Sequence, residues 1–201
     1  MSHDKNIRAY NNKAARYEQT LDGKFTEKFK QRLVVAMTVN NGDHVLDVGC
    51  GTGSLLGKIA EMTEIVGYGT DISPQMVAVA TEAHPSFVFK TASCEALPFE
   101  DESMDVVTVC CAYHHFPDVN TFAQDAARVL KPGGRLYIAD ILLPPGIRHI
   151  VNIFLPLSRD GDVKFYAPKA ITRTVMAHGF SIVKHLRKRH IQILECIKRQ
   201  A

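Results

Sequence analysis

The stretch "VLDVGCGTGSLL", Val45 to Leu56, places three glycines within five residues, directly after a run of β-forming residues. Glycine lacks a Cβ atom, so this strand-to-helix turn can adopt tight angles and bring its backbone close to a ligand. The spacing is GxGxG, and Ser54 stands where a dinucleotide fingerprint needs glycine or alanine. Asp47, two residues before Gly49, would repel a pyrophosphate. The turn therefore favours a ligand that carries positive charge.

A second carboxylate, Asp71, ends the next predicted strand, twenty residues beyond Gly51. An acidic side chain at this place can accept hydrogen bonds from both hydroxyls of a ribose. The two acids together indicate an adenosine joined to a cationic, zwitterionic tail.

Strand patterns alternate with helix patterns along most of the chain. Repeated alternation of this kind predicts an α/β fold with a doubly wound, mostly parallel sheet. Two final strands around the basic turn Arg187–Arg189 predict an antiparallel hairpin at the sheet edge. The strands are expected over 44–49, 64–72, 86–93, 104–113, 135–141, 180–186 and 190–197, and the helices over 53–62, 73–84, 119–130 and 168–178, with two more in the first 40 residues.

Composition and charge restrict the class of protein. The 201 residues are 46% hydrophobic with a net charge of +3, as in one compact domain without a polyanionic partner. No apolar run approaches the length of a membrane span, and the N-terminus lacks a signal-peptide core, so we expect a cytoplasmic protein. The five cysteines show no CxxC spacing, so free thiols and no metal site are expected.

Five blocks of sequence resemble one family, in that family's order: "VLDVGCGTG", "GTDISPQM", "ASCEALPFEDESMDVV", "AYHHFPD" and "RVLKPGGRLYIAD". They resemble the class I S-adenosylmethionine-dependent methyltransferases, in particular the small-molecule branch with the ubiquinone and menaquinone C-methyltransferases. The resemblance covers residues 10–141. It implies a Rossmann-like, seven-stranded sheet in a single domain, 1–201, with a helical cap (1–40), a cofactor-binding core (41–141) and an acceptor-side segment with a C-terminal hairpin (142–201).

The resemblance also assigns residues to the cofactor, S-adenosyl-L-methionine. Asp47, Gly49 and Gly51 would surround its methionine end, and Asp71 would hold the ribose. Against the adenine ring the resemblance places the side chains of Ile72 and Met76, for which core packing is the alternative.

Three further residues are assigned to the cofactor by the resemblance. Ser93 stands where family members commonly have an aspartate that accepts from the adenine amino group, and its neutral hydroxyl should contribute less. Cys94 would present its backbone N–H to the ring. Tyr17 resembles part of an N-terminal element that closes over the cofactor, and Tyr10 is a second candidate for lining the site; packing of an amphipathic helix is the alternative.

The reaction needs few catalytic groups, because a sulfonium already activates its methyl group. His115 and His114 follow the fourth strand of the core and are candidates for removing a proton from the acceptor, or else they shape the strand end. The apolar segment 147–157 is expected to form an acceptor pocket wall, a dimer contact or plain core. The oligomeric state is expected to be a monomer or homodimer.

The absence of two sequence motifs favours a small-molecule acceptor. The fourth strand ends without the Asn/Asp-Pro-Pro-aromatic tetrapeptide associated with methylation of exocyclic or side-chain amide nitrogens. The sequence also has no Pro-Cys dipeptide, which would supply the nucleophile of pyrimidine C5 chemistry. The basic turn at 187–189 is the only patch that suggests nucleic acid, and a solvated hairpin tip explains it equally well. The alternatives are a protein or RNA methyltransferase and a non-catalytic cofactor-binding subunit. An NAD-dependent oxidoreductase is disfavoured by Asp47 and by the GxGxG spacing.

Overall fold

A computed structural model describes residues 2–155 and 162–200. The α-helices are α1 (Ser2–Lys13), α2 (Leu21–Ala36), α3 (Ser54–Ala60), α4 (Pro74–Ala83), α5 (Val119–Val129), α6 (Pro145–Phe154) and α7 (Pro168–Ala177), with 3-10 turns η1 (Ala14–Gln19) and η2 (Tyr113–His115). The strands are β1 (Asp43–Val48), β2 (Ile65–Asp71), β3 (Val88–Thr91), β4 (Met104–Cys110), β5 (Leu130–Ile141), β6 (Phe180–Lys188) and β7 (Ile191–Lys198).

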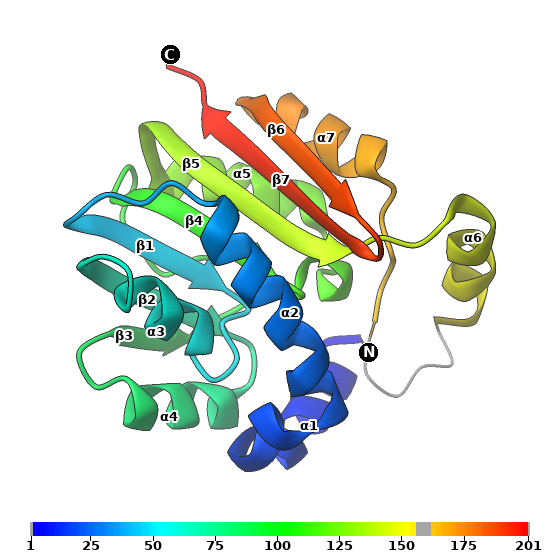
Figure 1. Cartoon of the computed structure of the whole chain (residues 1–201), viewed down its shortest axis with the longest axis horizontal. Helices are drawn as coiled ribbons and strands as arrows, with labels where there is room; N and C mark the ends of the chain where they lie inside the picture. The colour runs from blue at the N-terminus through cyan, green and yellow to red at the C-terminus, as the bar shows by residue number, and fades with distance from the viewer. Residues whose placement is uncertain (1, 156–161, 201) are drawn as a thin grey trace.

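All seven strands form one sheet in the order β3-β2-β1-β4-β5-β7-β6 (Figure 1). The first five strands pair in parallel, and β7 runs antiparallel between β5 and β6. This confirms the predicted doubly wound sheet and its C-terminal hairpin. β7 lies inside because six of its residues in a row are buried, whereas the mostly exposed pattern of β6 suits the sheet edge.

Each face of the sheet carries its own hydrophobic core. One core packs α2 and α3 on the sheet, with Phe29 and Leu55 against Val45. The other packs α5 and α7 on the opposite face, with Phe122 and Val175 among its fully buried side chains. Neighbouring residues of one strand enter different cores, because successive side chains of a strand point to opposite faces.

The helix starts follow from local chemistry. Ser73 caps α4 by accepting a hydrogen bond from the Met76 N–H at 3.1 Å, and Pro74 occupies the first helical position, as predicted. Asp118 caps α5 in the same way, with the Asn120 N–H at 2.8 Å. These caps place the helix N-termini near the carboxyl ends of the strands, where ligands of such sheets bind.

Two local expectations need correction. The "KPGG" stretch, expected as a turn before a strand, lies within β5, where the pairing shifts from Met104–Leu130 to Val106–Arg135 across a bulge. The segment 147–157, expected as a pocket wall, a dimer contact or plain core, lies mostly in helix α6, whose Ile147, Ile150 and Phe154 are 53%, 58% and 61% exposed. No residue of α6 is buried, so the helix is not core, whereas Leu155 directly after it is buried. Positions 156 and 157 of that segment lie outside the described residues.

Candidate functional site

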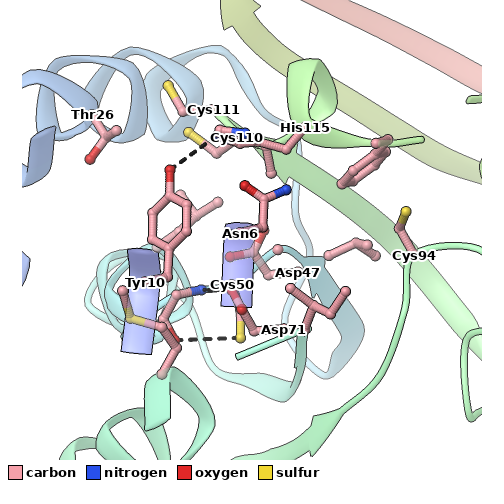
Figure 2. Close-up of a pocket in the computed structure, with 18 of the residues that line it drawn as sticks. Asn6, Tyr10, Thr26, Asp47, Cys50, Asp71, Cys94, Cys110, Cys111 and His115 are labelled. Atoms are coloured by element: carbon pink, nitrogen blue, oxygen red, sulfur yellow. Dashed lines mark hydrogen bonds between the residues drawn. The ribbon is translucent and has the colours of Figure 1, made fainter. Parts of the chain in front are cut away.

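A cavity opens at the carboxyl ends of β1, β2 and β4, beneath α1, η1 and α2 (Figure 2). It encloses about 890 Å³ of space, its open mouth included. Every residue predicted to contact the cofactor lines it: Asp47, Gly49, Gly51, Asp71, Ile72, Met76, Ser93, Cys94 and Tyr17. His115 lines it as well, but His114 does not. The fold therefore gathers almost the whole predicted set around one space, while their individual roles stay predictions.

The glycine turn forms the floor of the cavity. The backbone N–H groups of Gly49 and Cys50 both donate to the Thr70 carbonyl, at 2.7 and 2.9 Å, which ties the end of β1 to β2. Gly49 has a φ of +75°, and a Cβ built there would lie 2.5 Å from the Cβ of Ala112. Gly49 is thus required both for its backbone angle and for its close approach to the end of β4.

Asp71 joins the glycine turn to the loop after β2. Its Oδ2 accepts from the Gly51 N–H at 2.9 Å, and its Oδ1 accepts from the Ser73 N–H at 2.8 Å. Burial raises the pKa of this carboxyl group, and the two N–H donors oppose that rise. Each carboxylate oxygen has a second acceptor site, so Asp71 can still receive a pair of ribose hydroxyls.

Asp47 is the most deeply buried acid of the cavity, with an exposed fraction of 2%. Its Oδ1 accepts from the Thr108 hydroxyl at 2.7 Å. Burial raises its pKa to about 7, although Thr108 and the charge of Lys30 act in the opposite direction. A cation placed beside a carboxyl group with such a raised pKa stabilises its charged form and lowers the pKa again.

The N-terminal cap contributes residues that sequence reasoning missed. Lys30 of α2 lies 3.1 Å from Glu18, and Glu18 accepts from the Thr52 hydroxyl at 2.5 Å. Burial alone would raise the pKa of Glu18, but the Thr52 hydroxyl and Lys30 outweigh it and lower the pKa. This network ties η1 and α2 to the glycine loop. Nothing in the sequence relates Lys30 to residue 52, because their contact depends on how α2 crosses the sheet.

α1 adds Asn6, which sequence reasoning missed, and Tyr10, which was a candidate for lining the site. Asn6 is 4% exposed, its Oδ1 has no hydrogen-bond partner among the described residues, and it lies between Asp47 and His115 in Figure 2. Tyr10 follows one helical turn later and donates or accepts at His115 Nε2, 3.0 Å away. The i, i+4 spacing of Asn6 and Tyr10 was the available signal for a shared helix face.

The adenine end of the predicted site is mostly apolar. Met76 is 1% exposed and packs with Ala14 and Tyr17, while Ile72 is half-buried. The Ser93 hydroxyl accepts from the Glu95 N–H at 3.3 Å, so part of its bonding capacity is used within its own loop. All five cysteines are free, as expected, and Cys50, Cys94, Cys110 and Cys111 line the cavity.

The two histidines of η2 have different surroundings. The Nδ1 of His115 lies 3.1 Å from Asp162 Oδ1. His114 was expected at the rim, but its ring is buried, with Nδ1 2.6 Å from Asp140 Oδ1. Burial alone would lower the pKa of His114, but Asp140 outweighs it and raises the pKa. The difference arises because consecutive residues of the turn point in different directions.

Comparisons with known proteins show which family this sequence resembles. Residues 46–138 match the family model described as "Methyltransferase domain". The 27-O-demethylrifamycin SV methyltransferase of Amycolatopsis mediterranei is 36% identical over 126 residues, which cover 60% of this chain and 46% of that protein. The demethylmenaquinone methyltransferase of Chlorobaculum parvum is 36% identical over 148 residues, covering 68% of this chain and 61% of that protein. The chain thus spans about half the length of the curated relatives it matches.

Among solved structures, a chain of the Haloferax volcanii complex between the Trm112 methyltransferase activator and a methyltransferase superposes with a TM-score of 0.84. It is 19% identical, and the match covers 95% of this chain and 98% of that chain, which establishes the shared fold. Among the described residues, no helix is both long and apolar enough to cross a membrane. Residues 46–138 therefore belong to the methyltransferase domain family, and the chain has the Rossmann-like fold of the S-adenosylmethionine-dependent methyltransferases.

Proposed function

We propose that this protein transfers the methyl group of S-adenosylmethionine to a small-molecule acceptor by in-line displacement. The observation that carries the proposal is the joint position of Asp47, Asp71 and the glycine turn around one cavity, in a chain of the methyltransferase domain family. Two of the relatives named above are methyltransferases of rifamycin and menaquinone precursors, which supports a small acceptor.

In this proposal the cavity residues bind and orient rather than react. Asp71 accepts from the ribose hydroxyls while the N–H groups of Gly51 and Ser73 hold its carboxylate in place. Asp47 provides a buried negative group near the amino and sulfonium charges of the cofactor. The sulfonium makes the methyl group electrophilic, so the remaining work is alignment of the acceptor and exclusion of water.

The acceptor would enter beside Tyr10, His115 and Phe116, which line the cavity at the end of β4. His115 is the candidate for removing a proton from the acceptor, and Tyr10 and Asp162 hold its ring from two sides. His114 lies outside the cavity lining, so its proposed contribution is to support the position of His115, at a ring distance of 4.1 Å.

Methyl-labelled S-adenosylmethionine, incubated with the purified protein and a soluble cell extract, tests the proposal. Label should appear in a discrete small metabolite and should disappear with the Asp71→Ala protein. The control variant Glu82→Ala changes an exposed acid of α4 and should leave transfer unchanged.

Two other outcomes would contradict the proposal. Label found only in protein or RNA would point to a macromolecular acceptor, a possibility kept open by the structural neighbour that was solved with an activator subunit. Cofactor binding without any transfer would point to a non-catalytic subunit.

A further inference from the structure

Two histidines and an aspartate meet behind the acceptor end of the cavity. One carboxylate oxygen, Asp162 Oδ1, lies 3.1 Å from His115 Nδ1 and 3.7 Å from His114 Nε2. The three candidate ligand atoms all lie within 4.8 Å of one another. Within residues 2–155 and 162–200, no other group of three histidine, cysteine or acidic side chains meets this spacing.

The far nitrogen of each imidazole ring is held by another residue. Asp140 Oδ1 lies 2.6 Å from His114 Nδ1, and the Tyr10 hydroxyl lies 3.0 Å from His115 Nε2. Metal-binding histidines characteristically have their second nitrogen held in this way by a carboxylate or another polar group, which fixes the orientation of the ring. Asp140 and Tyr10 thus aim the remaining two nitrogens toward Asp162.

The backbone also positions Asp162. The N–H groups of Val163 and Lys164 both donate to the carbonyl oxygen of His114, at 2.9 and 3.0 Å. The Asn152 side chain pairs with the Phe165 backbone through two hydrogen bonds, at 2.9 and 3.1 Å. The chain after residue 161 is therefore anchored directly to η2 and to α6.

The charges of the cluster favour a cation. Asp140 is 1% exposed, and its Oδ2 has no hydrogen-bond partner among the described residues. Two carboxylates thus face the His114 ring, Asp140 at Nδ1 and Asp162 at Nε2. A divalent ion bound between the two rings would balance the negative charges of Asp140 and Asp162.

We propose that His114, His115 and Asp162 bind a divalent transition-metal ion of the zinc class. Ligand bonds of about 2.0–2.2 Å place neighbouring ligand atoms roughly 3.3 Å apart, close to the two shorter separations in the cluster. Three protein ligands leave a coordination position open, as in catalytic zinc sites. This assignment replaces the expectation from the cysteine spacing that the protein has no metal site.

The place of the site suggests its use, and this step alone rests on the proposed function. His115 lines the cavity but His114 and Asp162 do not, so a bound ion would lie behind the His115 ring and fix that ring at the acceptor end of the cavity. With Nδ1 bound to a metal and Nε2 held by Tyr10, His115 would position the acceptor instead of removing its proton.

Zinc binding to the chelator-treated protein tests the site without any methyl acceptor. Competition with a chromogenic chelator should give one tight equivalent of Zn²⁺, and Co²⁺ should bind with the visible absorption of an ordered site. His115→Gln and Asp162→Asn should each weaken Zn²⁺ binding by more than about 100-fold, and Asp140→Asn by about 10- to 100-fold. His149→Gln removes an exposed histidine of α6 and is the control for adventitious binding.

Equal Zn²⁺ affinity in the wild type and Asp162→Asn would overturn the proposal, as would loss of the tight equivalent in His149→Gln. Binding of S-adenosylmethionine by each variant shows that the variant is folded. Because it is measured separately, a failed cofactor site and a failed metal site are distinguishable.

Discussion

Asp71 accepts a hydrogen bond from the backbone N–H of Gly51 at 2.9 Å, so the acid that ends β2 also holds the glycine turn after β1. Asp71→Ala removes this bond together with the proposed contact to the ribose. Loss of one charged acceptor costs about 1.5–3 kcal/mol, so cofactor affinity should fall about 10- to 100-fold in isothermal titration calorimetry.

Asp71→Asn separates the two roles. An amide oxygen can still accept from Gly51 or Ser73 but provides no charge, so its affinity should lie between those of the wild type and Asp71→Ala. An Asp71→Ala protein that binds S-adenosylmethionine as tightly as the wild type would remove Asp71 from the proposed site.

Cofactor affinity should depend on pH through Asp47. Its pKa is raised to about 7 in the absence of ligand, and a bound cation favours the ionised form and lowers that pKa. Cofactor affinity should therefore reach its maximum above pH 7 and decrease as the pH falls below 7, by up to about tenfold per pH unit. The control is Asp47→Asn, which should bind the cofactor more weakly at high pH and should lose the pH dependence of affinity. If the pH dependence is unchanged in Asp47→Asn, it belongs to another group.

The same carboxyl group should reduce stability at high pH. It loses its proton near its ordinary value of 3.8 in the unfolded chain but only at about 7 in the folded one. The folded state therefore holds the extra proton between these values, and the free energy of unfolding falls as pH rises through the window. Asp47→Asn should unfold at a higher temperature than the wild type above pH 7, with a gap that closes toward about pH 4. A gap of constant size would contradict the link to Asp47.

Lys30 is expected to determine the pH at which Asp47 titrates. Its charge lowers the pKa of Asp47, so Lys30→Met should move the midpoint of the pH-dependent binding curve to a higher pH. Lys58→Met removes a lysine from a more exposed pair with Glu27 and should leave the midpoint in place. Identical midpoints in the wild type and Lys30→Met would show that Lys30 does not act on Asp47.

Two glycines with similar backbone angles should respond differently to alanine. Gly49 has a φ of +75° and no room for a Cβ beside Ala112, whereas Gly42, at +82°, has no atom within 4 Å of that position. Gly42→Ala should cost about 1–2 kcal/mol of stability, from backbone strain alone. Gly49→Ala should cost about 2–5 kcal/mol, because overpacking is added to the strain. Equal losses in chemical denaturation would show that the end of β4 moves aside.

Much of the cofactor end was predictable from local sequence. The three glycines after β1, the acid two residues before them and the acid at the end of β2 stand at strand ends, and parallel strand ends meet at one edge of a sheet. The cap of α4 was equally local, since Ser73 and Pro74 act within one turn. The separation of His114 from the cavity was not predictable, because side-chain direction in η2 depends on the packing around it.

The sequence by itself determined the order of strands and helices, their alternation around a parallel sheet and the cofactor-side acids, because periodicity, caps and glycine turns act over a few neighbouring residues. Only the tertiary structure decided that Lys30 reaches Glu18, that α6 stands away from the cavity and that Asp162 meets His115. Those contacts join distant segments, and they depend on how helices cross the sheet and where connecting chains are anchored, which no local pattern records.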